Sequence, residues 1–391
     1  MKFLLIYVPN LRFREFHTEW EKIQIGNLIK ERKEYTSDFE KYPLYSFTIE
    51  SGITPKSDRY ERSFLVKKEG DLFKIVHQND FVMNPMNLRF GAINYSKINQ
   101  TVSVSGYYDI FTIDACKYNE FWNAYLKTPR MLYTYNTIAT GSLVEKKRVY
   151  FKQLKELKMC IPSEMEKNKI NEFINLLNER IQTQNKIIDD LVLQKKYIIS
   201  SLLKSIQDSE KIMLKDILFD YNIKTTINNE YPVLSSTASG MYLQSDYFNK
   251  ETSSDNTIGY KIVPRGYCTY RSMSDTGLFT FNIQNLVEKG IVSPAYPVFS
   301  SNDDYINEFI ILYLNNSSYI KKQILELKSG GTRFALPFST LCTLKIPKLE
   351  KEKQLSLIKT ITAFERKIEN EEIILNALHQ QKIFLLNNMF I

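Results

Sequence analysis

The chain has 391 residues, of which 43% are hydrophobic, and this length can hold two or three domains with buried cores. Its net charge of +8 suits a polyanionic partner such as nucleic acid, although an ordinary basic protein can carry the same excess. The four cysteines are far apart and form no C-x-x-C pair, which argues against a zinc site or a disulfide framework and is typical of a reducing cytosol. The apolar run at the N-terminus spans only about six residues, too short for a signal peptide or a membrane span, so we expect a cytoplasmic protein without a membrane partner.

From its N-terminus onward, the sequence predicts a globular domain followed by a long helix, twice over. Each globular part is rich in Tyr, Phe, Val and Ile in short runs broken by Gly, Pro, Asn and Asp, which predicts a mixed domain dominated by strands. Two segments contain neither proline nor glycine and are dominated by Leu, Ile, Lys, Glu, Asn and Gln, which indicates long helices. The predicted parts are a first domain at 1–163 with an N-terminal arm at 1–20, a first helix at 164–207, a second domain at 208–350 and a second helix at 351–391.

An internal repeat runs through the whole chain at an interval of about 187 residues. The matches keep the same order in both halves, which chance would not produce, so we expect two copies of one folding unit. The clearest pairs are EKIQIGNLI (21–29) with EKIMLKDIL (210–218), FKIV (73–76) with YKIV (260–263), NEFWNAYL (119–126) with NEFIILYL (307–314), and LVLQKKYIISSLL (191–203) with LHQQKIFLLNNMF (378–390).

Both predicted helices carry apolar residues that step alternately by four and three, which is the spacing of a coiled-coil seam. Each seam has two polar interruptions, Gln184 and Lys195 in the first helix and Glu371 and Lys382 in the second. An antiparallel pair lets the second domain begin where the first helix ends. Because polar seam residues often fix the register, we predict that Gln184 lies against Lys382 and Lys195 against Glu371. The alternative is that the lysines reach the edge of the seam and select no register.

The predicted fold class is therefore α+β, with two similar mixed α/β domains separated by two long helices that form an antiparallel coiled coil with a pseudo-two-fold repeat. An object with two similar, basic and aromatic-rich heads suits a DNA duplex, whose strands are also related by two-fold symmetry. Because the heads differ in sequence, the expected DNA target is bipartite and asymmetric. A protein that bridges two other proteins and an enzyme are the competing interpretations.

The sequence offers little for catalysis. An amino-methyltransferase should carry an Asn/Asp-Pro-Pro-Tyr/Phe loop, and NPMN (84–87) lacks the second proline and the aromatic residue. There is no G-x-x-x-x-G-K-[ST] phosphate loop, and the three histidines, His17, His77 and His379, are widely scattered. Three scattered histidines offer few candidates for a metal site or a Ser-His-Asp triad, so we expect no catalytic residue and no metal ligand in this chain.

The opening PNLRFREFHTEW (9–20) resembles the P-x-LRF-x-x-F…W opening of the specificity subunits of type I restriction–modification systems. The end of each repeat resembles that family as well, with a glycine-containing basic turn, then Φ-x-x-L-x-x-L-x-IP, and a long helix that ends in LL…F. The resemblance covers essentially the whole chain. It departs at KNKI (167–170), where the family usually has a Glu-Gln pair.

This resemblance implies a DNA-specificity subunit that is not itself an enzyme. Each globular part would be a target recognition domain that reads one half of a bipartite site in double-stranded DNA. The paired helices would set the spacer length and dock two methyltransferase subunits, through which restriction subunits assemble. S-adenosylmethionine, ATP and Mg would belong to those partners, and this chain would hold no cofactor. The alternative is a stand-alone bivalent DNA-binding or protein-bridging scaffold without methyltransferase partners.

Candidate residues for DNA contact lie on basic loops that contain glycine, because side chains there reach base edges and glycine lets the main chain approach phosphate. Two pairs of segments meet this description, the turns at 139–148 and 328–334 and the loops at 83–91 and 270–277; the alternative is that these are ordinary solvated loops. The candidates are Gly141, Ser142, Lys146, Lys147, Arg148, Gly330, Gly331, Thr332 and Arg333 in the turns, and Asn87, Arg89, Arg271 and Ser274 in the loops.

Overall fold

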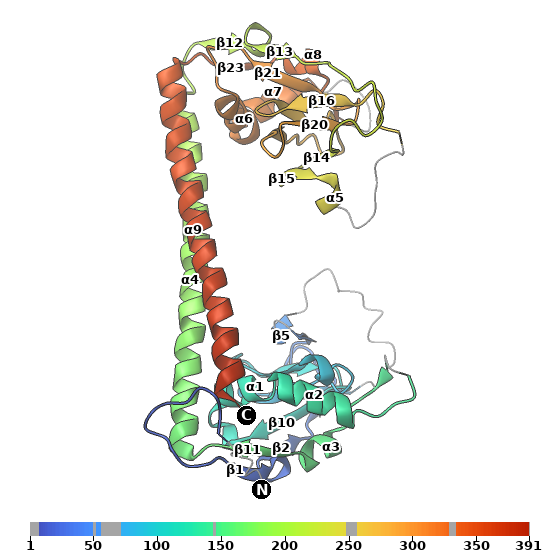
Figure 1. Cartoon of the computed structure of the whole chain (residues 1–391), viewed down its shortest axis with the longest axis vertical. Coiled ribbons are helices and arrows are strands. Elements are labelled where there is room, and N and C mark those ends of the chain that lie inside the picture. Colours follow the sequence, from blue (N-terminus) through green and yellow to red (C-terminus); the bar gives the residue numbers. More distant parts are fainter. Residues whose placement is uncertain are drawn as a thin grey trace, which may run out of the picture. The chain divides into compact units, whose positions relative to one another are not determined.

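The structure, a computed structural model, describes residues 8–49, 52–55, 72–143, 146–247, 256–327 and 334–390. It divides into two compact units, one formed by Met1–Asn185 with Ile373–Ile391 and the other by Lys186–Glu372. The two long helices that the sequence predicts are α4 (Glu164–Ser205) and α9 (Lys351–Met389), and each contributes one part to each unit (Figure 1). Across the described residues, no helix combines the length and the apolar character needed to cross a membrane.

The first unit is built around a four-stranded antiparallel sheet with the strand order β2-β10-β7-β8. A three-stranded sheet (β3-β6-β9) and two strand pairs, β4-β5 and β1-β11, complete its β-structure. The described strands are β1 (Glu21–Gln24), β2 (Ile29–Arg32), β3 (Tyr35–Thr36), β4 (Tyr45–Thr48), β5 (Gly52–Pro55), β6 (Phe73–Val76), β7 (Phe81–Met83), β8 (Ile93–Tyr95), β9 (Val102–Val104), β10 (Asp109–Ile113) and β11 (Lys158–Ile161).

Three short α-helices accompany these strands. They are α1 (Asn119–Tyr125), α2 (Pro129–Ile138) and α3 (Phe151–Glu156), and a 3₁₀ turn, η4 (Leu88–Phe90), follows β7. The start of α2 has a local cause, because the Thr128 hydroxyl accepts a hydrogen bond from the Met131 N–H and a proline occupies the first helical position.

The second unit repeats this arrangement. Its four-stranded sheet has the order β13-β21-β17-β19, and β12-β23, β14-β15, β16-β20 and β18-β22 form antiparallel pairs. The strands are β12 (Lys211–Met213), β13 (Leu218–Asp220), β14 (Leu234–Thr237), β15 (Gly240–Leu243), β16 (Lys261–Pro264), β17 (Cys268–Tyr270), β18 (Met273–Ser274), β19 (Phe281–Ile283), β20 (Lys289–Val292), β21 (Val298–Ser301), β22 (Phe334–Ala335) and β23 (Lys345–Pro347), and the short helices are α5 (Gln244–Tyr247), α6 (Asn307–Asn316), α7 (Ser318–Glu326) and α8 (Phe338–Leu341).

The internal repeat is therefore present in the strand pairing as well as in the sequence. Strands β2, β10, β7 and β8 of the first unit correspond to β13, β21, β17 and β19 of the second, in the same order and with the same antiparallel pairing. Helices α1, α2 and α3 correspond to α6, α7 and α8. The prediction of two similar mixed domains with two long helices is confirmed.

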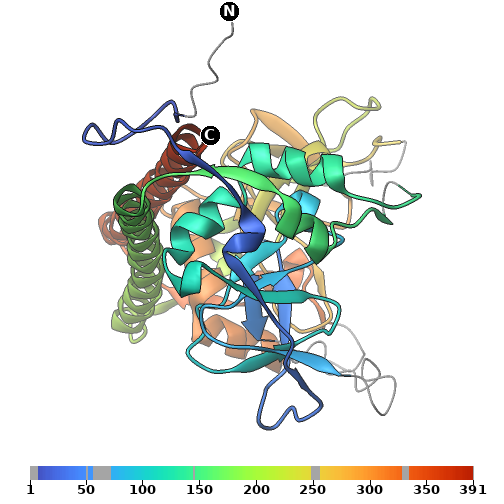
Figure 2. The same ribbon diagram turned by 90° about the horizontal axis from the view of Figure 1, so that it is seen from below.

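The core of the first unit joins the sheet to both long helices. Phe390, just beyond α9, stacks on Tyr125 of α1 with 5.1 Å between ring centroids, and its ring also meets those of Trp20 and Phe121. Ile170 at the start of α4 lies in the same buried cluster. Within this unit α4 and α9 therefore run antiparallel, and they lie side by side in both views of the chain (Figure 1, Figure 2).

The N-terminal arm is fixed to the same two helices. The Leu11 N–H donates to the Asn388 carbonyl at 2.8 Å. Arg12 forms a bidentate pair with Glu166 in the first turn of α4, at 2.7 and 2.6 Å. Because the Glu166 side chain is fully buried, this pair removes a charge that would otherwise be costly to bury. The two ends of the described chain thus meet in one unit.

The second unit has an equivalent core. Leu203 near the end of α4 and Ile361 near the start of α9 pack with Phe309 and Tyr313 of α6 in one buried cluster. The helices again run antiparallel within the unit. Apolar burial of this kind contributes roughly 1.5–3 kcal/mol for each large side chain that becomes fully buried.

The lysines of the helix seams bond to polar residues of the opposite helix. In the first unit the Lys382 Nζ donates to the Asn178 Oδ1 at 2.6 Å. In the second unit the Lys195 Nζ donates to the Glu365 Oε1 at 2.7 Å. The two contacts are equivalent, because Lys382 corresponds to Lys195 and Glu365 to Asn178 at the interval of the repeat. The helix pair therefore uses one antiparallel register in each unit.

The predicted register, with Gln184 against Lys382 and Lys195 against Glu371, is wrong. Each lysine instead meets a polar residue that lies six positions earlier on the opposite helix. The physical reason is the length of the lysine side chain, which carries its ammonium group from the seam to the edge of the helix pair. Buried leucines and isoleucines also line the seams. The alternative, that the lysines select no register, stays a prediction.

Cysteine cross-linking tests this register. We expect a short bismaleimide to join N178C to K382C rapidly in the first unit, because the two side chains are in contact. The same reagent should join Q184C to K382C slowly. The products are mapped by mass spectrometry, with the parent chain and its four native cysteines as background. Preferential cross-linking of the 184–382 pair would refute the register.

Two phenylalanines at the end of α9 give a matched test of the first core. Phe390 is 7% exposed within the aromatic cluster, whereas Phe384 is 64% exposed. We expect Phe390→Ala to destabilise the first unit by about 3–5 kcal/mol, and Phe384→Ala to change stability by no more than about 0.5 kcal/mol. Differential scanning calorimetry measures both. Equal shifts of the unfolding midpoint would contradict the packing described for Phe390.

Candidate nucleic-acid interface

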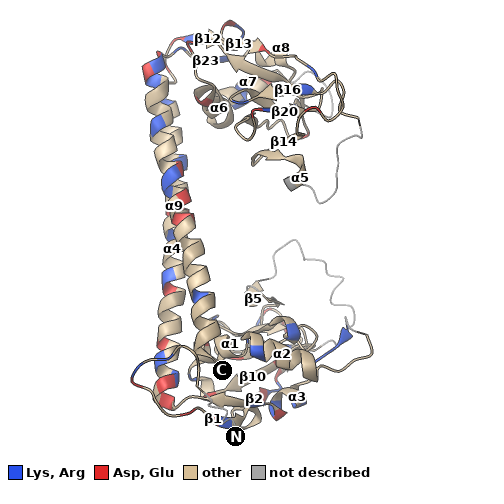
Figure 3. Cartoon of the chain, in the orientation of Figure 1, with Lys and Arg blue, Asp and Glu red and all other residues tan. Residues whose placement is uncertain are grey.

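The basic turn after α2 is closed at its base by two main-chain hydrogen bonds. Thr140 and Arg148 exchange both N–H···O bonds, each at 2.9 Å. Gly141 adopts a φ of 150°, and a Cβ at this position would lie 3.0 Å from the Lys147 Cα. Only glycine fits there without strain. The base of the turn is therefore fixed, and the turn carries basic residues beyond the end of α2 (Figure 3).

The basic residues of this turn have no acidic partner among the residues that the structure describes. Lys146, Lys147 and Arg148 form no ion pair with any residue that the structure describes, and the Arg148 guanidinium lies 5.4 Å from the centre of the Tyr107 ring. Other basic groups of the unit are paired, as Arg12 is with Glu166. Lysines and arginines on an exposed turn are the groups that bind phosphate in nucleic acids.

The loop after β7 lies directly beside this turn. The Val149 N–H donates to the Pro85 carbonyl at 2.9 Å, which joins the end of the turn to the loop. Arg89 donates to the Asn136 Oδ1 on α2 at 3.3 Å, and its guanidinium lies 5.0 Å from the centre of the Phe90 ring. The structure thus brings the two predicted segments of the first unit together, although more than 40 residues separate them in the sequence.

The second unit joins its two candidate segments by the equivalent bond. The Leu336 N–H donates to the Ser272 carbonyl at 2.8 Å, and these residues correspond to Val149 and Pro85 at the interval of the repeat. Strands β18 and β22 add a short antiparallel pair between the same segments. Of the predicted residues, Gly330, Gly331, Thr332 and Arg333 lie outside the described residues.

The other predicted residues of the second unit, Ser274 and Arg271, have different surroundings. The Ser274 hydroxyl accepts hydrogen bonds from the N–H groups of Thr276 and Gly277, at 3.3 and 3.1 Å, so it shapes the turn. Gly277 has a φ of 78°, and a Cβ there would lie 3.0 Å from the Phe334 ring. Arg271 is exposed and makes no hydrogen bond or ion pair with the described residues, so its guanidinium is available to a ligand.

In the first unit, Asn87 and Ser142 have different surroundings. The main chain of Asn87 is held in the β7–η4 turn, where its carbonyl accepts from the N–H groups of Phe90 and Ala92 at 2.9 and 3.1 Å. Its side chain is half-buried, whereas Ser142 is exposed at the tip of the basic turn. Both remain predictions as DNA contacts.

Sequence reasoning missed the outer face of α2. Tyr133 is 74% exposed, and Arg130, Asn136 and Thr137 are exposed on the same helix. The hydrogen bond from Arg89 to Asn136 places this face next to the candidate loop. The signal in the sequence was the i, i+3, i+4 spacing of polar residues over 130–137, which marks the outward face of an amphipathic helix.

The described residues contain no group of three or more His, Cys, Asp or Glu side chains that could hold a metal ion. The arrangement that the structure does provide is a surface of arginine, lysine, amide and aromatic side chains on loops of defined shape. These are the side chains with which proteins contact phosphate, base edges and stacked bases.

Comparison with known proteins finds matches among solved structures. No family model matches the chain, and no curated protein matches its sequence. The type I restriction–modification system S subunit from M. genitalium is 13% identical with a TM-score of 0.50, and the alignment covers 98% of this chain and 99% of that chain. A chain from a structural study of complex assembly and conformational transition in the type I R-M system is 12% identical with a TM-score of 0.57, with coverage of 95% and 97%. The chain therefore has the fold of these proteins over nearly its whole length.

Proposed function

We propose that this chain is the DNA-specificity subunit of a type I restriction–modification complex and has no catalytic activity of its own. The observation that carries the proposal is the duplicated site, in which each unit joins a loop and a turn by the same main-chain hydrogen bond. The fold shared with S subunits and the sequence resemblance to that family support the proposal.

Each unit reads one half of a bipartite target in double-stranded DNA. In the first unit, Arg89 and Asn87 on the loop and Asn136 on α2 contact base edges, since arginine reads guanine and asparagine reads adenine in the major groove. The hydrogen bond from Arg89 to Asn136 supports this assignment because it joins the loop to α2. In the second unit Arg271 takes this role, and Ser274 shapes the loop that carries it. Because the two loops differ in sequence, the two half-sites differ and the target is asymmetric.

The basic side chains of the turn in the first unit position the duplex. Lys146, Lys147 and Arg148 contact phosphates, and the main chain at Gly141 and Ser142 approaches the backbone closely. Phosphate contacts of this kind increase affinity for every sequence and make binding depend on salt. Gly330, Gly331, Thr332 and Arg333 are the corresponding candidates in the second unit.

The long helices dock two copies of a methyltransferase subunit and set the spacer between the half-sites. Exposed apolar side chains support this role because they occur at equivalent positions in the two units. Tyr197 is 75% exposed in the second unit and Phe384 64% in the first, and Ile187 and Ile374 form a second equivalent pair. A repeated apolar patch suits two copies of one partner. S-adenosylmethionine, ATP and Mg are bound by the partner subunits, and restriction subunits join through the methyltransferase.

The experiment that tests the proposal is co-purification of the full chain with type I methyltransferase subunits from the same cells, followed by sequencing of the methylated adenines. Two methyltransferase subunits per chain and methylation at a split, asymmetric site are the expected results. DNA binding without recruitment of a methyltransferase would instead identify a stand-alone bivalent DNA-binding protein. Binding to neither would leave a scaffold that bridges proteins and would overturn the proposal.

Substitution of Arg271 distinguishes a residue that reads bases from one that contacts phosphate. We expect Arg271→Ala to weaken binding of the target by about 1–3 kcal/mol and to relax specificity in one half-site only. Lys146→Ala should weaken binding to all sequences alike and lower the dependence of log affinity on log salt concentration by about one. The measurement is binding of the assembled complex to duplexes with each target base changed in turn.

The control for this prediction is Arg265→Ala. Arg265 belongs to the same unit as Arg271, but its guanidinium is already paired with Glu288 at 2.7 Å. Its loss should leave both affinity and specificity unchanged. An equal loss of affinity for every duplex on Arg271→Ala would assign Arg271 to phosphate contact instead.

Stoichiometry tests the proposed docking surfaces. We expect Tyr197→Ala and Phe384→Ala each to reduce the bound methyltransferase from two copies to one, and the double variant to bind none, because each removes the exposed aromatic ring of one patch. Native mass spectrometry of the co-purified complex gives the count. Tyr133→Ala removes an equally exposed ring on α2 and should leave two copies bound. Two copies on the double variant would place docking elsewhere.

A further inference from the structure

A pocket of about 420 Å³ lies in the first unit, between the globular domain and the long helices. Its wall includes Lys97 after β8, Glu120 on α1, Lys127 after α1, Asn178 on α4 and Lys382 on α9. The described lining residues thus place three lysines around one cavity with a single carboxylate among them.

The carboxylate is already engaged. The Tyr95 hydroxyl donates to the Glu120 Oε1 at 2.7 Å, and Lys97 forms an ion pair with the same oxygen. The Glu120 side chain is only 7% exposed, so it has little capacity for a further cation. Its ion pair is with one lysine of the three, and its negative charge also favours the charged forms of Lys127 and Lys382.

The other two lysines are bonded to neutral amide groups. The Lys127 Nζ donates to the Asn94 Oδ1, and the Lys382 Nζ donates to the Asn178 Oδ1 at 2.6 Å. Neither forms an ion pair with a described residue. Two ammonium groups therefore face the same cavity without a counter-charge of their own.

Burial disfavours the charged form of both lysines. Removal from water lowers the pKa of Lys127 to about 8, against the opposing effect of Glu120, and the positive charges of Lys382 and Lys97 add to the lowering. Burial likewise lowers the pKa of Lys382. Because buried charges in proteins are normally paired, an anion in the cavity would stabilise both ammonium groups.

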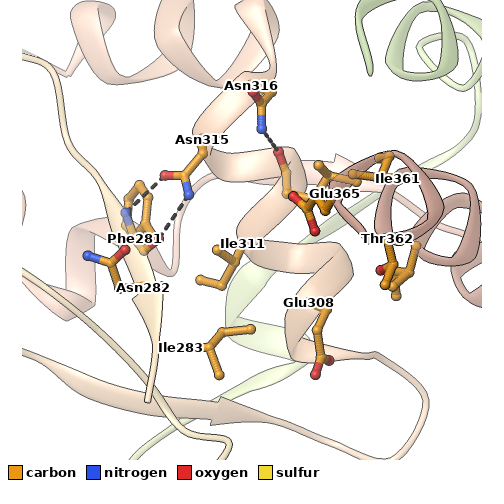
Figure 4. Close-up of a pocket in the computed structure, with 12 residues that line it drawn as sticks. Phe281, Asn282, Ile283, Glu308, Ile311, Asn315, Asn316, Ile361, Thr362 and Glu365 are labelled. Atoms are coloured by element: carbon orange, nitrogen blue, oxygen red, sulfur yellow. Dashed lines mark hydrogen bonds between the residues drawn. The ribbon is translucent and has the colours of Figure 1, made fainter. Parts of the chain in front are cut away.

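The second unit has a pocket at the equivalent place, with the opposite balance of charge (Figure 4). Asn315 stands where the first unit has Lys127, and its amide bonds to the main-chain N–H and carbonyl of Phe281 at 2.9 and 2.8 Å. Glu365 stands where the first unit has Asn178, and it pairs with Lys195 at 2.7 Å. The second unit thus forms the equivalent pocket with an amide in place of Lys127, while it keeps a lysine, Lys195, at the position equivalent to Lys382.

We propose that the basic pocket of the first unit binds a phosphate group, held by the ammonium groups of Lys127 and Lys382 with Lys97 at its edge. A phosphate offers several acceptor oxygens to donors that converge from different elements, and ammonium groups bind it as point charges. The pocket shares no residue with the loops and turns proposed to read DNA. The phosphate belongs either to a small phosphorylated compound or to the backbone of a nucleic acid, and the test separates these sources.

The test is isothermal titration of the full chain with inorganic phosphate, at an ionic strength held constant with chloride. We expect Lys382→Met to weaken phosphate binding on the order of ten-fold or more, because it removes one charge-assisted donor. The matched control is Lys195→Met, which removes the equivalent lysine and the same charge from the second unit. Phosphate affinity of this control should be unchanged.

A second variant distinguishes loss of phosphate binding from a folding defect. Lys127→Asn introduces the residue that the second unit carries at the equivalent position, and it should weaken phosphate binding while leaving thermal unfolding in phosphate-free buffer unchanged. If inorganic phosphate does not bind, the same variants are measured with a duplex of arbitrary sequence. A fall of the salt dependence by about one for each lysine removed would assign the pocket to the DNA backbone and support the proposal. Binding of phosphate and duplex that does not respond to Lys127→Asn or Lys382→Met would overturn it.

Discussion

Each compact unit depends on apolar packing between its globular domain and the long helices. In the first unit this packing centres on Phe390, whose ring stacks on Tyr125 and meets Trp20 and Phe121. A segment at one end of the chain thereby completes a core built mostly from the other end. Through this contact α9 packs directly on α1. The second unit meets the same requirement with Leu203, Ile361 and the aromatic side chains of α6.

The internal repeat allows structural features common to both units to be distinguished from residues that are specific to one unit. Strand order, helix order and the bond between loop and turn are common to both units, so they belong to the architecture. Differences at equivalent positions carry the individual chemistry of each unit. Lys127 against Asn315 and Asn178 against Glu365 convert one pocket from acidic to basic without changing the elements that form it. Comparison of the two halves of this molecule thus distinguishes the residues that both units share from those that differ between them.

The architecture could be predicted from the sequence because its signals are long and repeated. Two helices free of proline and glycine, together with ordered matches at a constant interval, leave few alternatives. The register could not be predicted, since a lysine side chain reaches past the seam and bonds at its edge, as Lys382 does with Asn178. The pairing of loop and turn also escaped prediction, because the bond from Val149 to Pro85 involves only main-chain atoms and leaves no trace in side-chain identity. Lys97, Lys127 and Lys382 belong to one pocket only in the folded chain.

The hydrogen bond between Leu11 and Asn388 has a consequence for the connectivity of the fold. Because the two ends of the described chain meet within one unit, a short linker could join them without disturbing the packing of α9 on α1. New ends could then be opened in the brief connection between α4 and β12, where the chain passes from helix to strand. The packing of the two halves therefore does not depend on which half comes first along the polypeptide. The packing itself would accept the reverse order, in a circular permutant with the same contacts.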